Sequence, residues 1–162
     1  MSICLISIAL FQPDIPQNTG AILRLGACLD LPVHIIEPCG FLFDDRKLRR
    51  AGMDYLDDVT YHRHLDWQKF SDFQQSIGRK VLATRFGADT LDTFRFQPGD
   101  CIVMGRESAG VPADIHNACD ARVVIPMRPQ LRSLNVAQSA SILAFEACRQ
   151  LDLLPSMELD NE

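Results

Sequence analysis

The chain of 162 residues lacks the motifs that most directly indicate a nucleotide-dependent enzyme or a hydrolase. It contains neither a G-x-G-x-x-G dinucleotide fingerprint nor a G-x-S-x-G nucleophile elbow. Its one G-x-x-x-x-G stretch, Gly105–Gly110, is not followed by the Lys-Ser/Thr pair of a P-loop. These absences argue against dinucleotide oxidoreductases, P-loop NTPases and α/β-hydrolases.

Metal-finger signatures and long hydrophobic runs are also missing. None of the six cysteines forms a C-x-x-C pair, and most of them stand among apolar neighbours, so we expect reduced core cysteines in a cytoplasmic protein. On a strand, His62 and His64 would point the same way, but two ligands without a nearby third predict no metal site. The apolar run Ile3–Phe11 is too short to span a membrane and is expected to be a buried strand rather than a signal peptide.

The composition is that of an ordinary globular domain. Hydrophobic residues make up 47% and charged residues 23% of the chain, which is enough to form a core. We predict a single domain over residues 1–154 and a frayed tail over 155–162. The net charge of −5 argues against broad nonspecific binding of nucleic acid but leaves room for a local basic patch.

Apolar strand-like runs alternate with helix-like patterns along most of the chain. This alternation predicts an α/β fold with a mainly parallel sheet flanked by helices. Ligands of such sheets collect at the carboxyl ends of the strands, so the loops there are the place to look for a site. The expected strands are Ile3–Leu10, Val33–Glu37, Lys80–Thr84, Cys101–Met104 and Arg122–Ile125.

The loop after the first strand leads into a helix that carries an isolated arginine. Asn18 or Thr19 is expected to cap this helix, and Gly20 allows close backbone approach. Arg24 is the only charge between Asp14 and Asp30. It requires a carboxylate, a phosphate or a partner chain if it is buried, and the alternative is a snorkelling arginine or a plain salt bridge.

The densest basic patch comprises Arg46, Lys47, Arg49 and Arg50. Helical spacing can place three of these arginines on one face, which favours phosphate contact. The alternative is a solvated face paired with neighbouring aspartates.

Two further stretches have the character of ligand sites. Gly105 and Gly110 frame a loop in which Glu107 can accept a hydrogen bond from a ligand. The segment Arg122–Cys148 reads as a strand, a proline-marked loop and a long helix whose start carries Asn135 and Gln138 in a capping arrangement. A helix start suits a carboxylate, a phosphate or a nucleotide-like ligand.

Three of these stretches in order resemble the motifs of the SPOUT superfamily of RNA methyltransferases, in its TrmH-like 2′-O-methylating branch. They are Pro16–Gly20 with Arg24, Met104–Pro112, and Ile125–Met127 leading to Arg132–Ala137. The segment Gly40–Tyr55 is also similar to the small TrmL-type tRNA (cytidine/uridine-34-2′-O)-methyltransferases. The resemblance implies a fold with a C-terminal deep trefoil knot and a homodimer that binds S-adenosyl-L-methionine.

The resemblance also implies roles for particular residues. Arg24 would hold the substrate phosphate and orient the reacting hydroxyl, because a guanidinium rarely gives up its proton. Ser133 and Asn135 would position the ribose or the cofactor, with support from Glu107 and Asn18. The cofactor is expected against Ala83, Thr84, Gly105, Ile125, Met127, Ser133 and Leu134.

The implied reaction is methylation of the ribose 2′-hydroxyl of the wobble nucleotide, position 34, in tRNA. Because one domain must then read the RNA as a dimer, Arg24 can serve the other subunit's cofactor site. The RNA contacts would come from the basic patch, which would grip the anticodon stem-loop, and from Arg132. Two alternatives remain open at this stage: the same chemistry at another tRNA or rRNA position, and a non-catalytic RNA-binding protein on the same fold.

Overall fold

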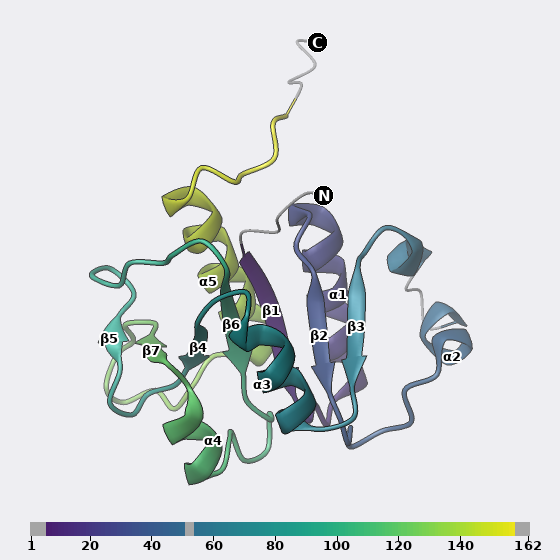
Figure 1. The fold of residues 1–162 in the computed structure, drawn as a ribbon, viewed down its shortest axis with the longest axis horizontal. Coiled ribbons are helices and arrows are strands. Elements are labelled where there is room, and N and C mark those ends of the chain that lie inside the picture. The colour runs from purple at the N-terminus through teal and green to yellow at the C-terminus, as the bar shows by residue number, and fades with distance from the viewer. Residues whose placement is uncertain (1–5, 51–53, 158–162) are drawn as a thin grey trace.

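A computed structural model describes residues 6–50 and 54–157, and within these ranges one parallel sheet of seven strands forms the centre of the molecule (Figure 1). The strand order is β3-β2-β1-β6-β4-β7-β5, and every strand pair is parallel. The strands are β1 (Ile6–Phe11), β2 (Val33–Ile36), β3 (Tyr61–His64), β4 (Lys80–Ala83), β5 (Asp89–Thr90), β6 (Asp100–Met104) and β7 (Ala121–Val124).

Helices cover both faces of the sheet. Helices α1 and α5 pack against each other and against the central strands, whereas α3 packs on β2 and β3 from the opposite face (Figure 1). The helices are α1 (Pro16–Leu29), α2 (Asp45–Arg50), α3 (Trp67–Gln75), α4 (Ala113–Ala118) and α5 (Val136–Gln150), with a 3₁₀ turn, η1, at Asp54–Asp57.

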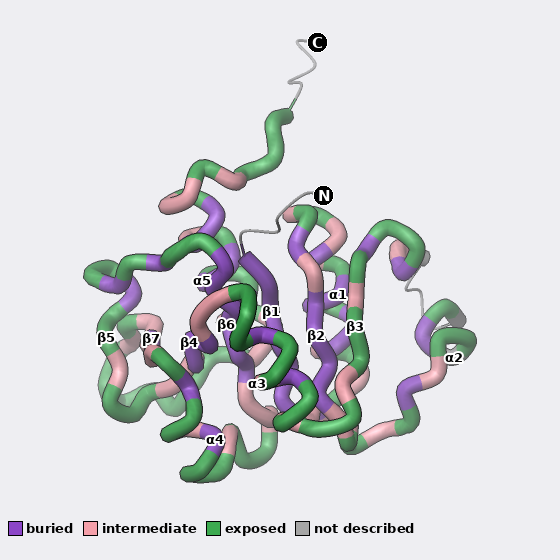
Figure 2. The backbone as a smooth tube through the Cα atoms, viewed as in Figure 1, coloured by how far each residue is buried: buried purple, intermediate pink, exposed green. Residues whose placement is uncertain are grey.

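The core is divided by the central strands into two apolar clusters. Successive side chains of a strand point to opposite faces, so Ile8 and Leu10 of β1 join the cluster under α1 and α5, while Ala9 and Phe11 join the cluster under α3. Both faces are covered, and all six residues of β1 are buried (Figure 2). This double burial explains why the strand reads as a continuous apolar run.

The predicted fold class is confirmed. The five expected strands correspond to β1, β2, β4, β6 and β7, although residues 3–5 of the first lie outside the described residues. The strand pattern did not reveal β3, a polar edge strand, or β5, which has two residues. The knot implied by the family resemblance stays a prediction.

The topology brings four loops to one edge of the sheet. Strand β1 lies between β2 and β6, with β2 and β3 on one side of it and β6, β4, β7 and β5 on the other. The ends of β1 and β6 are in register at Leu10 and Met104, and those of β4 and β7 at Ala83 and Val123. The loops after these strands therefore open on the same side.

After Leu153, which still packs against the core, the chain leaves the body of the molecule (Figure 1). Residues 155–157 are exposed and carry no regular secondary structure, and the remainder of the predicted tail lies outside the described residues. In the part of the chain that the structure describes, none of the helices combines the length and apolarity needed to cross a membrane.

Candidate active site

A cavity of about 460 Å³ lies where the carboxyl ends of β4, β6 and β7 meet the first turns of α1 and α5. This is the edge at which open parallel sheets bind ligands. Ten of the residues singled out in the sequence line it: Asn18, Ala83, Thr84, Gly105, Glu107, Ile125, Met127, Ser133, Leu134 and Asn135. The fold thus brings together residues from all three motifs.

The third motif ends in a capped helix start. The Asn135 Oδ1 accepts hydrogen bonds from the backbone N–H groups of Ala137 at 2.8 Å and Gln138 at 3.3 Å. The predicted cap at Asn135 is therefore present at the start of α5. The cap leaves the side-chain amide nitrogen of Asn135 directed away from the helix.

The glycine loop folds back on itself as a tight hairpin. The backbones of Arg106 and Gly110 exchange hydrogen bonds of 3.0 and 2.9 Å, and Gly110 has a φ of +64°. A Cβ atom at Gly105 would lie 2.9 Å from the backbone of Gly110, closer than real Cβ contacts. Glycine is required at both ends, and the hairpin holds Glu107 at the cavity wall.

The first motif differs from expectation in how its helix begins. Neither Asn18 nor Thr19 is the cap, because α1 already starts at Pro16 and the N-cap residue, Ile15, makes no side-chain cap. Proline at the first position needs no partner for a backbone N–H and has a helical φ, which explains the earlier start. Asn18 consequently lies inside the first turn, with its side chain free to reach across the cavity.

A chain of hydrogen bonds joins the three motifs. The Asn135 Nδ2 donates to Asn18 Oδ1 at 3.0 Å, and Asn18 Nδ2 donates to Glu107 Oε1 at 3.4 Å. Burial raises the pKa of Glu107 above its ordinary value, and a hydrogen bond to Asp14 raises it further. The residues assigned supporting roles in the sequence therefore form one connected network.

Arg24 does not belong to this group within a single chain. It is exposed on α1, is not among the described residues that line the cavity, and its guanidinium lies 5.1 Å from the ring centre of Tyr55. Arg24 is therefore not the buried charge that the sequence left open as a possibility. Cation–π contact with Tyr55 holds the side chain at the surface.

Two arginines at the cavity were given no role from the sequence. Arg85 follows β4, and its guanidinium donates to the carbonyl oxygen of Arg132. Arg106 donates to Gln12 Oε1 and lies over the ring of Phe11. Each lies two residues after the end of a strand, and this position was the available signal, because loops after parallel strands fall at the ligand edge of the sheet.

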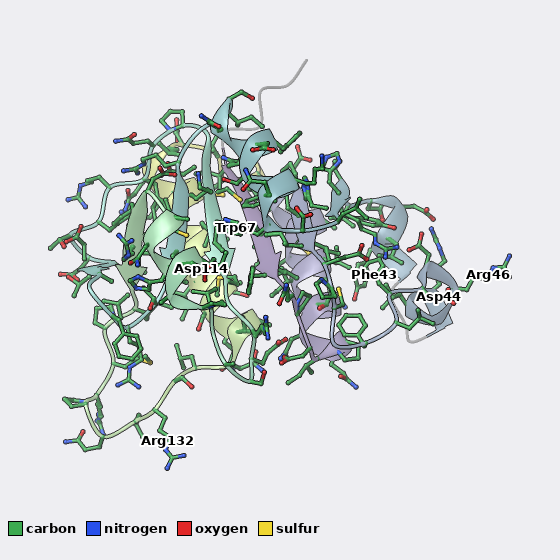
Figure 3. The ribbon with its side chains drawn as sticks, turned by 60° about the horizontal axis from the view of Figure 1, so that its bottom comes forward. Phe43, Asp44, Arg46, Trp67, Asp114 and Arg132 are labelled. Carbon is green, nitrogen blue, oxygen red and sulfur yellow. The ribbon has the colours of Figure 1, made fainter. Side chains whose placement is uncertain are left out.

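The residues predicted to bind RNA lie in two separate places. Arg46 on α2 and Arg132 on the loop before α5 project from opposite sides of the molecule (Figure 3). Arg49 forms an ion pair of 2.6 Å with Asp57, so part of the basic patch is neutralised. Lys47 and Arg50 also belong to α2, but their side chains lie outside the described set.

A histidine cluster lies on the face of the sheet covered by α3. His34 of β2 stacks on His62, with 5.4 Å between ring centres, and its Nδ1 is 3.0 Å from His64 Nε2. The sequence pointed to His62 and His64 but missed His34, which is adjacent only through the pairing of β2 with β3. Across residues 6–50 and 54–157, no group of three or more potential ligands is arranged to hold a metal ion.

Comparisons with known proteins identify the family. A family model described as the SpoU rRNA Methylase family matches residues 5–145. A tRNA (cytidine(34)-2′-O)-methyltransferase of Beijerinckia indica is 52% identical over 91% of this chain and 92% of its own. One with the same name from Escherichia coli K12 is 40% identical over 91% of this chain and 94% of its own.

Solved structures share the fold. A structure described as giving insights into the 2-OH methylation of C/U34 on tRNA has a TM-score of 0.84 and 37% identity, covering 91% of this chain and 96% of that one. The SpoU methyltransferase AviRb from Streptomyces viridochromogenes, in complex with the cofactor AdoMet, has a TM-score of 0.79 and 21% identity, covering 94% of this chain and 62% of that one.

Proposed function

Because the chain belongs to the SpoU rRNA methylase family, we propose that it methylates the ribose 2′-hydroxyl of the wobble nucleotide of tRNA, cytidine or uridine 34, with S-adenosylmethionine as the methyl donor. The observation that carries this proposal is the near full-length identity with tRNA (cytidine(34)-2′-O)-methyltransferases. The cavity that joins the three motifs is where the reaction would take place.

The cavity fits the methyl donor in size and in chemistry. Its volume of about 460 Å³ falls within the range of small-molecule sites. Ile125, Met127 and Leu134 provide apolar surface for a flat ring, and Gly105, which lets the hairpin close against Gly110, keeps this wall of the cavity in place. When bound, S-adenosylmethionine supplies a methyl group activated by its sulfonium sulfur.

The residues of the three motifs divide the remaining tasks. Methyl transfer to a hydroxyl requires in-line placement of the reacting atoms and removal of the hydroxyl proton. Ser133 and Asn135 position the ribose or the cofactor, with Asn18 and Glu107 as their support. Arg24 binds the phosphate next to the target nucleotide and orients its hydroxyl, because a guanidinium donates hydrogen bonds and keeps its proton.

Arg24 performs this role in the site of a second subunit, so the active form is a homodimer. Arg24 lies on α1, outside the cavity of its own chain. Helix α5, which packs on α1, exposes Ile142 to 41% and Phe145 to 53% on its outer side. Such an apolar helix face supports pairing with an identical copy, which would bring two α1 helices close to two cavities.

The dimer also provides the RNA surface. One protomer carries Arg46 and Arg132 on opposite sides, so the two basic groups form a continuous surface for an anticodon stem-loop only when the two subunits combine. The chain has no C-x-x-C pair among its cysteines, in keeping with a protein of the reducing cytoplasm. No metal is needed for the chemistry proposed.

A methylation assay on two substrates tests the proposal. Purified protein with radiolabelled S-adenosylmethionine is expected to methylate whole tRNA and an isolated anticodon stem-loop, with the label on the 2′-oxygen of nucleotide 34. A stem-loop whose nucleotide 34 carries a 2′-deoxyribose is the matched control and is expected to take up no label. Label at another tRNA position or in rRNA would contradict the assigned target, and absence of both label and cofactor binding would contradict an enzyme.

A further inference from the structure

The segment after β4 carries the most exposed aromatic ring of residues 6–50 and 54–157. Phe86 is 75% exposed, and none of the ring–ring or cation–π contacts among the described residues involves its ring. Arg85, the preceding residue, lines the cavity, so the ring stands beside the cavity rim. One exposed apolar side chain is common on a protein surface, so Phe86 indicates a site only together with its surroundings.

The backbone of Phe86 is fixed on both sides of the ring. Its N–H donates to the Thr84 hydroxyl at 3.3 Å, and the Thr84 N–H donates to the carbonyl oxygen of Val123 at 3.0 Å. The His116 Nδ1 accepts from Arg122 Nε at 3.3 Å, so Nε2 carries the proton that it donates to the Phe86 carbonyl oxygen at 3.1 Å. These hydrogen bonds tie the segment to β7 and α4, and a held backbone therefore presents the exposed ring.

Cationic side chains without acidic partners accompany the ring. Arg85 donates to the carbonyl oxygen of Arg132, which brings the loop before α5 to the segment that carries Phe86. That loop also exposes Arg128, and Leu131 to 60%. Arg85, Arg128 and Arg132 take part in none of the ion pairs of the described residues, whereas arginines elsewhere do. In a chain with a net charge of −5, cations left unpaired in one place indicate an anionic ligand.

An aromatic face accompanied by cations fits single-stranded RNA. Unpaired bases stack on aromatic side chains, and the phosphates beside them are attracted by positive charge. The bases of a duplex already stack on one another, so the fit is to an unpaired stretch such as the anticodon loop. The flat ring of the methyl donor has apolar surface of its own at Ile125, Met127 and Leu134, and Phe86 is not among the described residues that line the cavity. The Phe86 ring is therefore left for the RNA.

We propose that Phe86 is a stacking platform for an unpaired base of the anticodon loop, with Arg85 and Arg132 in contact with the phosphates beside that base. The inference rests on the proposed function, because the RNA in question is the one whose 2′-hydroxyl enters the adjacent cavity. A base stacked on Phe86 fixes the loop at the cavity rim. Phe86 contacts neither the methyl donor nor the reacting hydroxyl, and it acts on RNA binding alone.

Fluorescence anisotropy with a labelled anticodon stem-loop tests the stacking. The full-length protein is saturated with the demethylated product of S-adenosylmethionine, so that no turnover occurs during the titration. Phe86→Ala is expected to weaken RNA binding by about fivefold to a hundredfold, the effect of removing one base–aromatic stack. Phe86→Tyr keeps the ring face and should bind as the wild type does, whereas Phe86→Leu keeps only apolar bulk and should bind nearly as weakly as Phe86→Ala. Wild-type affinity in Phe86→Ala or Phe86→Leu would overturn the proposal.

Leu65→Ala is the matched control. Leu65 is also 75% exposed, but it follows β3, at the end of the sheet away from β4, and its loss should leave RNA affinity unchanged. In Phe86→Ala, the affinity for S-adenosylmethionine measured by calorimetry and the mass measured by sedimentation should equal those of the wild type. A loss of cofactor affinity or a change of mass would assign the ring to the cofactor site or to a subunit interface. Either result would overturn the proposal, as would equal loss of RNA affinity in Leu65→Ala.

Stem-loops with one abasic nucleotide identify the stacked base. Removal of that base should weaken binding to the wild type and have little further effect on Phe86→Ala, because both changes remove the same stack. Additive effects at every unpaired position of the loop would overturn the proposal. A wild-type protein that neither binds nor methylates the stem-loop would refute the proposed function and the stacking site with it. A normal label at nucleotide 34 together with unchanged binding in Phe86→Ala would refute the stacking site alone.

Discussion

At the residue scale, Arg24 is separated from the cavity that it is proposed to serve. Its guanidinium contacts the Tyr55 ring in the isolated chain, and the residues that would hold the methyl donor lie elsewhere. If Arg24 acts on the RNA and not on the cofactor, its replacement should lower turnover without changing the affinity for S-adenosylmethionine.

Arg24→Ala is therefore expected to lower the single-turnover rate by at least about a hundredfold, because it removes the group that orients the reacting hydroxyl. The affinity for S-adenosylmethionine, measured by calorimetry, should stay within about twofold, since Arg24 contributes no cavity surface in its own chain. Arg24→Lys, the matched control for charge, should recover little, because an ammonium lacks the planar fork of donors. A similar loss of turnover and cofactor affinity would show that the assigned role is wrong.

The burial of His34 should make the stability of the protein depend on pH. It is 3% exposed, and its pKa is lowered to about 3, first by burial and then by the charges that His64 and His62 would carry. The pKa of His64 is lowered as well. The folded state therefore favours neutral histidines at pH values where the unfolded chain is already protonated.

The free energy of unfolding should consequently fall as the pH drops below about 6.5, and the loss attributable to His34 continues towards pH 3. For His34 alone the slope is at most about 1.4 kcal/mol per pH unit. Urea unfolding at several pH values between 7.5 and 5 measures this slope. His34→Asn keeps a polar group opposite His64 but cannot titrate, so its slope should be shallower, and parallel curves for the two proteins would contradict the prediction.

At the element scale, the glycine hairpin is shaped by two different requirements. Gly110 needs glycine for its positive φ, whereas Gly105 needs it because the hairpin backbone approaches within 2.9 Å of where a Cβ would be. The hairpin carries Glu107 and forms one wall of the cavity. Ligand binding should therefore depend on the two glycines that let the hairpin close.

Gly105→Ala should push the two sides of the hairpin apart and weaken S-adenosylmethionine binding by about tenfold or more, since overpacking of this kind typically costs about 1 to 3 kcal/mol. Gly87→Ala is the matched control, because Gly87 has a φ of +60° but nothing within 4 Å of the place where a Cβ atom would stand. It should lower the melting temperature slightly through backbone strain and leave binding unchanged. Calorimetric titration of both variants distinguishes these effects, and unchanged affinity in Gly105→Ala would contradict the steric argument.

At the scale of the whole molecule, the proposed dimer combines residues that one protomer keeps apart. Arg24 lies outside the cavity of its own chain, and Arg46 and Arg132 lie on opposite sides of it (Figure 3). If each active site takes its cavity from one subunit and its arginine from the other, two inactive variants should complement each other.

Mixing Arg24→Ala with the cavity variant Gly105→Ala under conditions of subunit exchange should restore activity when S-adenosylmethionine is kept below the concentration that fills the weakened Gly105→Ala cavity. A hybrid dimer contains one site with both an intact cavity and an intact arginine, so an equal mixture is expected to reach about a quarter of the wild-type rate. The variants assayed separately, each at the same total concentration, provide the baseline. No recovery despite demonstrated exchange would place Arg24 in the site of its own chain.

Local patterns in the sequence were sufficient for much of the fold, and the family resemblance added most of the cavity residues. Double burial produces long apolar runs, and such runs placed β1, β2, β4, β6 and β7. Loops after parallel strands gather at one edge, and this rule together with the order of the motifs indicated Gly105, Ser133 and Asn135. These inferences succeeded because periodicity, glycine and proline act over only a few neighbouring residues.

Contacts between distant segments were decided by the folded chain. Asp14 meets Glu107 across 93 positions, and Asn18 meets Asn135 across 117, because β1 lies next to β6 and α1 packs on α5. His34 joins His64 through the pairing of β2 with β3. No local pattern encodes which strands are neighbours, since that choice reflects the burial of the whole core. The motifs could therefore be identified from the sequence, whereas the contact between Asp14 and Glu107, the histidine cluster and the distance of Arg24 from the cavity required the tertiary structure.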